Sequence, residues 1–264
     1  MPTLNEVNYS REACINAIRE YYRFLTKMFL DEDEILEPPE GGWPDIMPSA
    51  LQQLGKTEEV AALLRSLPYL RTEWEGQDAQ ATPWGLFANW TAEVHSVNRG
   101  KGSIEDIKVA TEGVSYPDDI PAHVVGLTST EDDYGRFLLD TELGVIYWME
   151  CEDEIANRSS RRPIRDDPYD YAEENETEWR AEGKAWAIAD FFEVLKEQFR
   201  KLKFIPINGK EVKDVYEMSD ERTEEGLREI QGTFREHGWP DLSRYRKHEC
   251  MAAVREASAR LDLN

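Results

Sequence analysis

Short runs of β-branched and aromatic residues near the middle of the chain predict a β-hairpin. The runs cover residues 134–140 and 145–149, and four residues that favour a turn separate them. Gly144 can supply the positive φ that a short connection needs, and Asp140 can hydrogen-bond the turn backbone through its own side chain. A further run over 120–128 predicts a neighbouring strand, so we expect a sheet of at least three strands.

Helical spacing of apolar residues follows the hairpin and recurs at both ends of the chain. Between Trp186 and Phe199, apolar side chains return every three or four positions, which predicts an amphipathic helix whose apolar face packs on the hairpin. The same spacing predicts four more helices over 10–30, 57–64, 221–236 and 242–261, with Ser10 and Thr57 as N-caps of the first two.

Two long segments show no clear hydrophobic period. Residues 68–121 predict loops, a short helix and an edge strand. Residues 150–182 carry twelve acidic residues and five arginines with almost no aliphatic side chains, which predicts a solvated, mobile insertion. We therefore expect one α+β domain over residues 1–264, a small, mainly antiparallel sheet covered by N- and C-terminal helices. Its parts are a core over 120–207, an acidic insertion over 152–183 and a C-terminal helical pair over 221–262.

The charge of the chain limits the partners that it can attract. Asp and Glu number 54 and Lys and Arg number 31, giving a formal net charge of −23. Such a field repels nucleic acid and anionic membranes, and it speeds association with a basic protein. A surface that serves solubility alone is the commoner meaning of such a charge.

The chain also predicts where the protein resides. No apolar run approaches the length of about 18 residues that a membrane helix needs, and the first residues lack the features of a signal peptide. The three cysteines lack metal or redox spacing, which favours reduced thiols. We expect a location in the cytoplasm or the nucleus, and the sequence does not set an oligomeric state.

Motifs of catalysis are missing from the sequence. The nucleophile elbow Gly-x-Ser-x-Gly does not occur, and the four histidines are far apart. The glycine-rich stretch at 99–103 lacks the spacer of a nucleotide-binding loop and has no apolar strand before it. We therefore expect no enzymatic activity and no cofactor.

Two acidic stretches are the candidate binding residues. The first, 150–154, is the densest carboxylate cluster, but it lacks the glycine and the alternating spacing of a calcium loop, so we expect solvated charge and no metal. The second, 166–171, mixes carboxylates with tyrosines, a pairing that suits a protein interface and is also typical of a plain acidic loop. The candidate partner-binding residues are Glu150, Glu152, Asp153, Glu154, Asp166, Asp167, Tyr169, Asp170 and Tyr171.

Four segments in order along the chain resemble the core of the SUKH superfamily, which contains fungal regulators of cell-wall synthesis and growth and bacterial immunity proteins that block nuclease toxins. They are Ile-Pro-Ala-His-Val-Val-Gly (120–126), Phe-Leu-Leu-Asp (137–140), Gly-Val-Ile-Tyr-Trp (144–148) and Ile-Ala-Asp-Phe-Phe-Glu-Val-Leu (188–195). Further segments, including 38–44 and 238–247, resemble parts of uncharacterised proteins from filamentous fungi. The acidic insertion is longer than is usual in the superfamily.

The resemblance implies an α+β protein-binding domain without catalytic residues. Together with the charge, it favours a non-enzymatic, regulatory protein that recognises a basic partner protein through an acidic surface bearing aromatic side chains. The alternative is a small-molecule-binding enzyme or accessory protein of a fungal biosynthetic pathway, with a pocket lined by Trp74, Trp84, Trp90 and Trp148.

Overall fold

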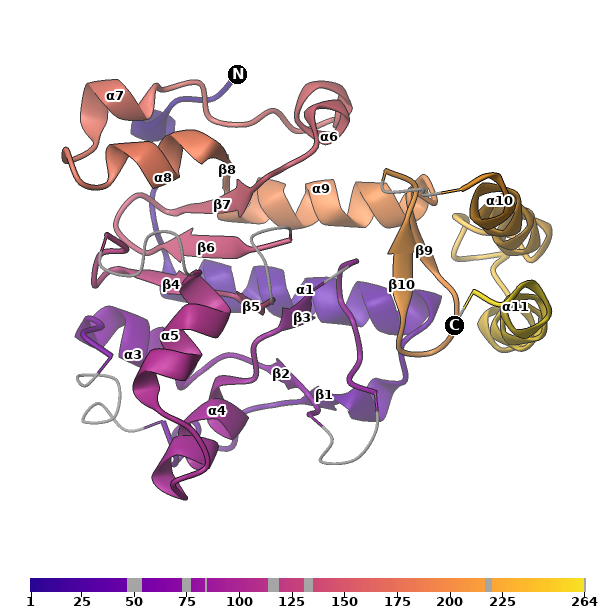
Figure 1. Cartoon of the computed structure of the whole chain (residues 1–264), viewed down its shortest axis with the longest axis horizontal. Helices are drawn as coiled ribbons and strands as arrows, with labels where there is room; N and C mark the ends of the chain where they lie inside the picture. Colours follow the sequence, from indigo (N-terminus) through magenta and orange to yellow (C-terminus); the bar gives the residue numbers. More distant parts are fainter. Residues whose placement is uncertain are drawn as a thin grey trace.

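An antiparallel four-stranded sheet in the order β4-β6-β7-β8 lies at the centre of the α+β fold (Figure 1). The computed structural model describes residues 1–46, 54–72, 77–83, 85–113, 119–130, 135–216 and 220–263. The strands are β4 (Val124–Gly126), β6 (Phe137–Asp140), β7 (Val145–Met149) and β8 (Gly183–Ala187). The hairpin prediction is confirmed, with Phe137 opposite Trp148 and Asp140 opposite Val145.

Side chains alternate across the strands and so give the sheet two buried faces. On one face α9 (Ile188–Arg200) packs against the hairpin, as expected, with the rings of Phe137 and Phe191 4.8 Å apart. Helix α1 (Arg11–Met28) packs in turn on α9, where Tyr21 meets Phe192. On the other face a smaller cluster gathers around Leu138, Tyr147 and Trp179.

The predicted N-caps of two helices are confirmed. Ser10 accepts a hydrogen bond from the backbone N–H of Ala13 at the start of α1. Thr57 accepts one from Val60 at the start of α3 (Glu58–Leu64). In each case the side chain satisfies an N–H group that has no partner inside the helix.

The sequence placed two strand boundaries incorrectly. The helix predicted from Trp186 begins at Ile188, because Trp186 belongs to β8, the edge strand beside β7. The strand predicted over 120–128 is shortened by a turn in which Val124 donates its N–H to the carbonyl of Pro121. Its last part, β5 (Thr128–Ser129), pairs instead with β3 (Leu86–Phe87).

Residues 68–121 hold more helix than predicted. Two nine-residue helices, α4 (Trp90–Asn98) and α5 (Ile104–Glu112), lie beside the sheet, each with a polar N-cap. Further short elements among the described residues are η1 (Leu4–Glu6), η2 (Glu32–Glu34), β1 (Ile35–Leu36), β2 (Tyr69–Leu70), β9 (Phe204–Pro206) and β10 (Val212–Asp214).

The C-terminal helices pack on each other at the far ends of α1 and α9 (Figure 1). Helix α10 (Glu221–Glu236) has the predicted bounds, whereas α11 (Lys247–Leu261) begins five residues later than expected. Asp241 accepts the N–H of Ser243 in a turn, so Leu242 is 48 % exposed and does not pack. Among the described residues, no helix combines the length and the apolar composition needed to span a membrane.

The acidic insertion is folded on the sheet, and the prediction of a solvated, mobile segment is wrong here. It forms α6 (Asp153–Arg158), α7 (Pro168–Tyr171) and α8 (Thr177–Glu182), which lie along the top of the molecule in Figure 1, on the β8 side of the sheet. Ile155 and Trp179 are buried despite the charge around them. Between α6 and α7, Ile164 donates its N–H to the carbonyl of Ala185, which satisfies part of the free edge of β8.

Candidate functional site

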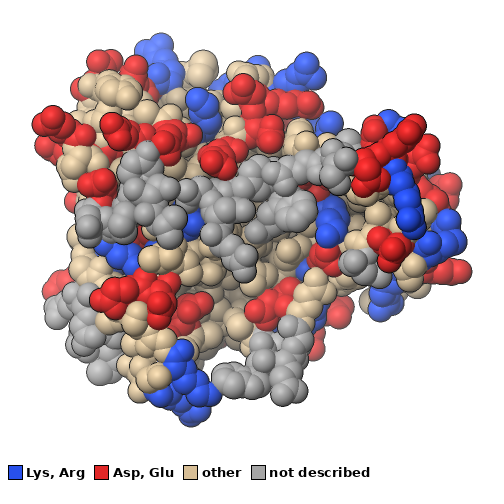
Figure 2. Space-filling view, viewed as in Figure 1, with Lys and Arg blue, Asp and Glu red and all other residues tan. Residues whose placement is uncertain are grey.

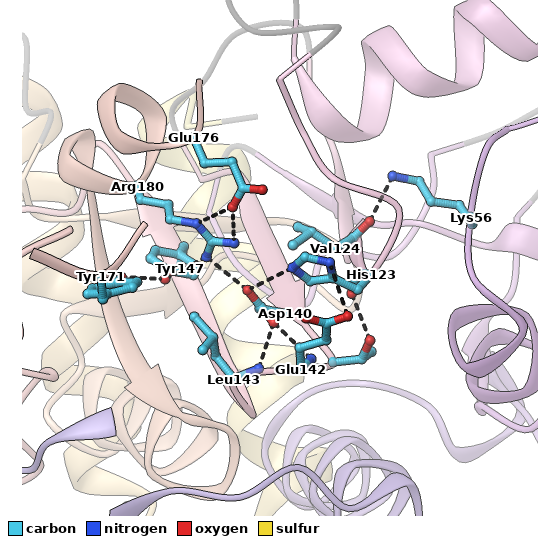
Figure 3. A network of polar contacts seen from close by, with 11 residues as sticks. Lys56, His123, Val124, Asp140, Glu142, Leu143, Tyr147, Tyr171, Glu176 and Arg180 are labelled. Atoms are coloured by element: carbon cyan, nitrogen blue, oxygen red, sulfur yellow. Dashed lines mark hydrogen bonds and ion pairs between the residues drawn. The ribbon is translucent and has the colours of Figure 1, made fainter. Parts of the chain in front are cut away.

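A buried network of charged side chains joins the acidic insertion to the central sheet (Figure 3). Arg180 of α8 is 3 % exposed, and its Nη1 donates to Asp140 Oδ2 and to the Tyr147 hydroxyl, each at 2.8 Å. Its Nε and Nη2 donate to Glu176 Oε2 at 2.9 and 2.7 Å. The guanidinium group thus lies between two carboxylates, the arrangement in which a buried arginine is best satisfied.

Asp140 connects this network to the turn of the hairpin. It lies at the end of β6 and is completely buried. Its Oδ1 accepts the backbone N–H groups of Glu142 and Leu143 at 2.9 and 2.8 Å, as the sequence predicts. Its Oδ2 faces Arg180 and lies 3.6 Å from Nε2 of His123 (Figure 3). One carboxylate therefore holds both the turn and the insertion.

The surroundings shift the pKa values of these groups. Burial alone would raise the pKa of Asp140, but the hydrogen bond from His123 and the charge of Arg180 hold it below its usual value. Burial works against the charged form of His123, yet Asp140 and Glu142 raise its pKa. Burial raises the pKa of Tyr147, so its hydroxyl stays protonated.

A cavity of about 400 Å³ lies where the insertion meets the edge of the sheet. Its lining comes from α6, α7, α8, β8 and the segment between α6 and α7, and Arg180 and Tyr147 belong to it. Cavities of this size are within the range of known ligand pockets. The N-terminal segment holds one side of the cavity in place, because Asp166 Oδ2 accepts the N–H of Leu4 at 2.9 Å.

The structure brings the two predicted acidic stretches together around this cavity. Asp153 from the first stretch and Asp166, Asp167 and Tyr171 from the second line it. Tyr169 and Asp170 lie beside them on α7, both exposed. Six of the nine predicted residues are thus in one place, although eleven residues separate the two stretches in sequence.

The other three predicted residues do not line the cavity. Glu154 Oε1 lies 3.4 Å from Lys203 Nζ. Burial, together with the nearby charge of Asp214, raises the pKa of Glu152. Glu150 ends the strand in the left-handed region with φ 51°. Both tyrosines were candidates for contact with a partner, but only Tyr169 is exposed, at 71 %. The Tyr171 hydroxyl lies 2.8 Å from that of Tyr147, because residues two apart in α7 point in different directions.

Within the described residues, no group of three or more His, Cys, Asp and Glu side chains could hold a metal ion. The alternative hypothesis expected a pocket lined by four tryptophans, and two of them, Trp74 and Trp84, lie outside the described residues. Trp90 and Trp148 are buried in the core: Trp90 donates to the carbonyl of Gly126, and Trp148 packs on Phe137. Neither lines the cavity at the insertion.

A second buried ion pair, which the sequence did not predict, holds the other side of β4. Lys56 Nζ lies 2.5 Å from Glu112 Oε1 and donates to the carbonyl of Val124 at 2.7 Å. Burial lowers the pKa of Lys56 and raises the pKa of Glu112, and each partner partly offsets the shift of the other. Like the Arg180 network, the pair is buried against the sheet, but Lys56 and Glu112 do not line the cavity at the insertion.

Comparison with known protein families, curated proteins and solved structures finds no match. The relation to the SUKH superfamily therefore remains a prediction from the quoted segments. The candidate site rests on the geometry of this chain alone.

Proposed function

We propose that the chain is a non-enzymatic, regulatory binding domain that recognises a basic partner protein. Its binding surface, called here the insertion surface, consists of the six residues that the fold brings together: Asp153, Asp166, Asp167, Tyr169, Asp170 and Tyr171. The observation that carries the proposal is this convergence of two separate acidic stretches around one cavity. The resemblance to SUKH domains supports the same class of function, with a location in the cytoplasm or the nucleus.

Charge and support both favour recognition at this place. Acidic side chains gather over α6, α7 and α8 on the face shown in Figure 2, with a few basic ones among them. Such a surface steers a basic partner toward it and rejects an acidic one. The Arg180 network fixes the helix beneath the insertion surface. Because the surface is already ordered, binding costs little conformational entropy. The exposed Tyr169 adds contact area at a small entropic cost.

The test neutralises the insertion surface and compares it with an equal change elsewhere. The test variant carries Asp153→Asn, Asp167→Asn and Asp170→Asn, in which asparagine keeps the size of each side chain and the cap of α7. The control carries Glu225→Gln, Glu236→Gln and Glu256→Gln, three exposed residues on the C-terminal helical pair. Both variants change the net charge by the same amount.

Each variant is used for affinity capture from a cell extract, with quantitative mass spectrometry of the bound proteins. We expect basic proteins that the wild type and the control retain and the test variant loses. The association rate of such a protein should fall steeply as salt rises. If the test variant and the control capture the same proteins equally well, or if the association rate is independent of salt, the proposal is wrong.

A further inference from the structure

We propose that the cavity at the insertion receives an arginine or lysine side chain of the partner. The inference rests on the proposed function and names the chemical group that the insertion surface recognises. It uses three features of the cavity: the small residues in its lining, the free carboxylate oxygens, and the position of the opposing cations.

The shape of the cavity suits a long side chain with an aliphatic stem. Small residues from three elements leave the space open: Ala156 on α6, Ala181 on α8, and Gly183 and Ala185 on β8. Apolar side chains of Ile164 and Pro168 also line it. Lysine and arginine bury their methylene groups on such surfaces while their charged ends reach polar partners.

Carboxylate oxygens for the charged end are available in the same cavity. The side chain of Asp153 forms no ion pair or hydrogen bond within the described residues. Asp166 and Asp167 each use one oxygen, for the N–H of Leu4 and of Tyr169 respectively, and the other oxygen has no partner in that part of the chain. A guanidinium or ammonium group with several donors fits this set.

The cations in the lining do not cancel these carboxylates. Arg180 is matched by Asp140 and Glu176, so the buried network as a whole is not positive. Arg165 and Lys184 are exposed, and neither forms an ion pair within the described residues. Met1, which carries the terminal amino group, also belongs to the lining. Counted with Asp140 and Glu176 of the network, five carboxylates lie against the four cations of Arg165, Arg180, Lys184 and Met1. With a net charge of −23 on the whole chain, the cavity favours a positive ligand.

The opposing charges give a test that depends on sign. The probe is N-acetyl-argininamide, titrated into the whole protein and followed by chemical-shift changes in NMR spectra. We expect a dissociation constant on the order of 1 mM or weaker, because a single side chain provides few contacts. Asp153→Asn should weaken binding about two- to fivefold and Lys184→Gln should strengthen it by a similar factor, the size typical of exposed charge pairs.

A neutral variant tests the shape of the cavity. Ala181→Leu fills the space without changing the charge and should abolish binding of the probe, whereas Ala252→Leu, exposed on α11, should leave it unchanged. N-acetyl-glutamate serves as the anionic probe and should not bind. Tighter binding of the anion, a reversed effect of the two charge variants, or unchanged binding in Ala181→Leu would overturn the inference.

The two proposals fail in different ways. If the arginine probe does not bind but capture of basic proteins still depends on the aspartates, the insertion surface binds its partner without a side chain in the cavity, and only this inference is lost. If the probe binds in the cavity but capture is the same in both triple variants, the cavity accepts cations and the proposed function is lost.

Discussion

Replacing Arg180 with methionine tests whether the buried network fixes the acidic insertion to the sheet. Methionine keeps most of the volume and removes the charge, leaving Asp140 buried at 0 % exposure without its closest cation. Breaking a buried ion pair from one side costs about 3–5 kcal/mol of unfolding free energy. His123 and two backbone N–H groups still contact Asp140, and Glu176 can reach water, so we expect the lower end, about 3 kcal/mol.

The measurement is equilibrium unfolding in urea, followed by tryptophan fluorescence. Arg228→Met serves as the control, because Arg228 forms an exposed pair with Glu224 on α10 and should cost at most about 0.5 kcal/mol. The double variant Asp140→Asn with Arg180→Met removes both charges, and asparagine can still accept from the turn. We expect it to recover most of the loss. A loss below about 1 kcal/mol for Arg180→Met, or additive effects of the two changes, would refute the role given to the network.

Three further predictions concern the support of the sheet. Burial opposes the charged ring of His123, but the carboxylates of Asp140 and Glu142 raise its pKa above 6.5. The stability that the charged ring contributes is therefore complete below pH 6.5 and is lost as the pH rises through the raised pKa. The difference in unfolding free energy between wild type and His123→Gln should be larger at about pH 6 than at about pH 9. Gly144 has φ 73°, and an added Cβ would lie 2.6 Å from the backbone nitrogen of Tyr9. Gly144→Ala should therefore lower the free energy of unfolding in urea by about 1–3 kcal/mol. Gly232→Ala, inside α10 with open space around it, should raise it by about 0.5–1 kcal/mol. Lys56→Met should cost about 3 kcal/mol, and adding Glu112→Leu should restore most of the transition midpoint; no recovery in the double variant would contradict the buried pair.

The sequence predicted the hairpin and α9 because their patterns depend on local chemistry. Alternating buried residues need only a turn with a positive φ to form two paired strands, and Gly144 provides it. The apolar face of α9 is continuous over three turns, so its partner had to be another apolar surface. The sequence identified Asp140 as a turn residue. It did not predict the ion pair that Oδ2 of the same carboxylate forms with Arg180, because nothing local indicates a partner forty residues away.

The fold of the insertion could not be predicted in this way, because its stability comes from distant segments. Its few apolar residues, such as Ile155 and Trp179, form no periodic face of their own. Trp179 is buried against Tyr147 and Met149 of β7, with Leu4 of the N-terminal segment packed on the same cluster, whereas Ile155 is buried in the main core. The average composition of the insertion predicted a solvated segment. The available signal of a buried helix was Trp179 next to Arg180, with Glu176 four residues before the arginine, the spacing of an ion pair within a helix.

The same insertion contains two sets of charges that serve opposite purposes. Arg180 and Glu176 are turned toward Asp140 and are compensated, so they hold the fold but present little field to a partner. The side chains of Asp153 and Asp170 are exposed and form no ion pair within the described part of the chain, so they repel their acidic neighbours and attract a basic protein. Rising salt should therefore weaken partner binding while it relieves repulsion within the insertion and leaves the buried network unchanged. Loss of binding in salt accordingly reports recognition at the insertion surface, because the support beneath it is not the part that salt screens.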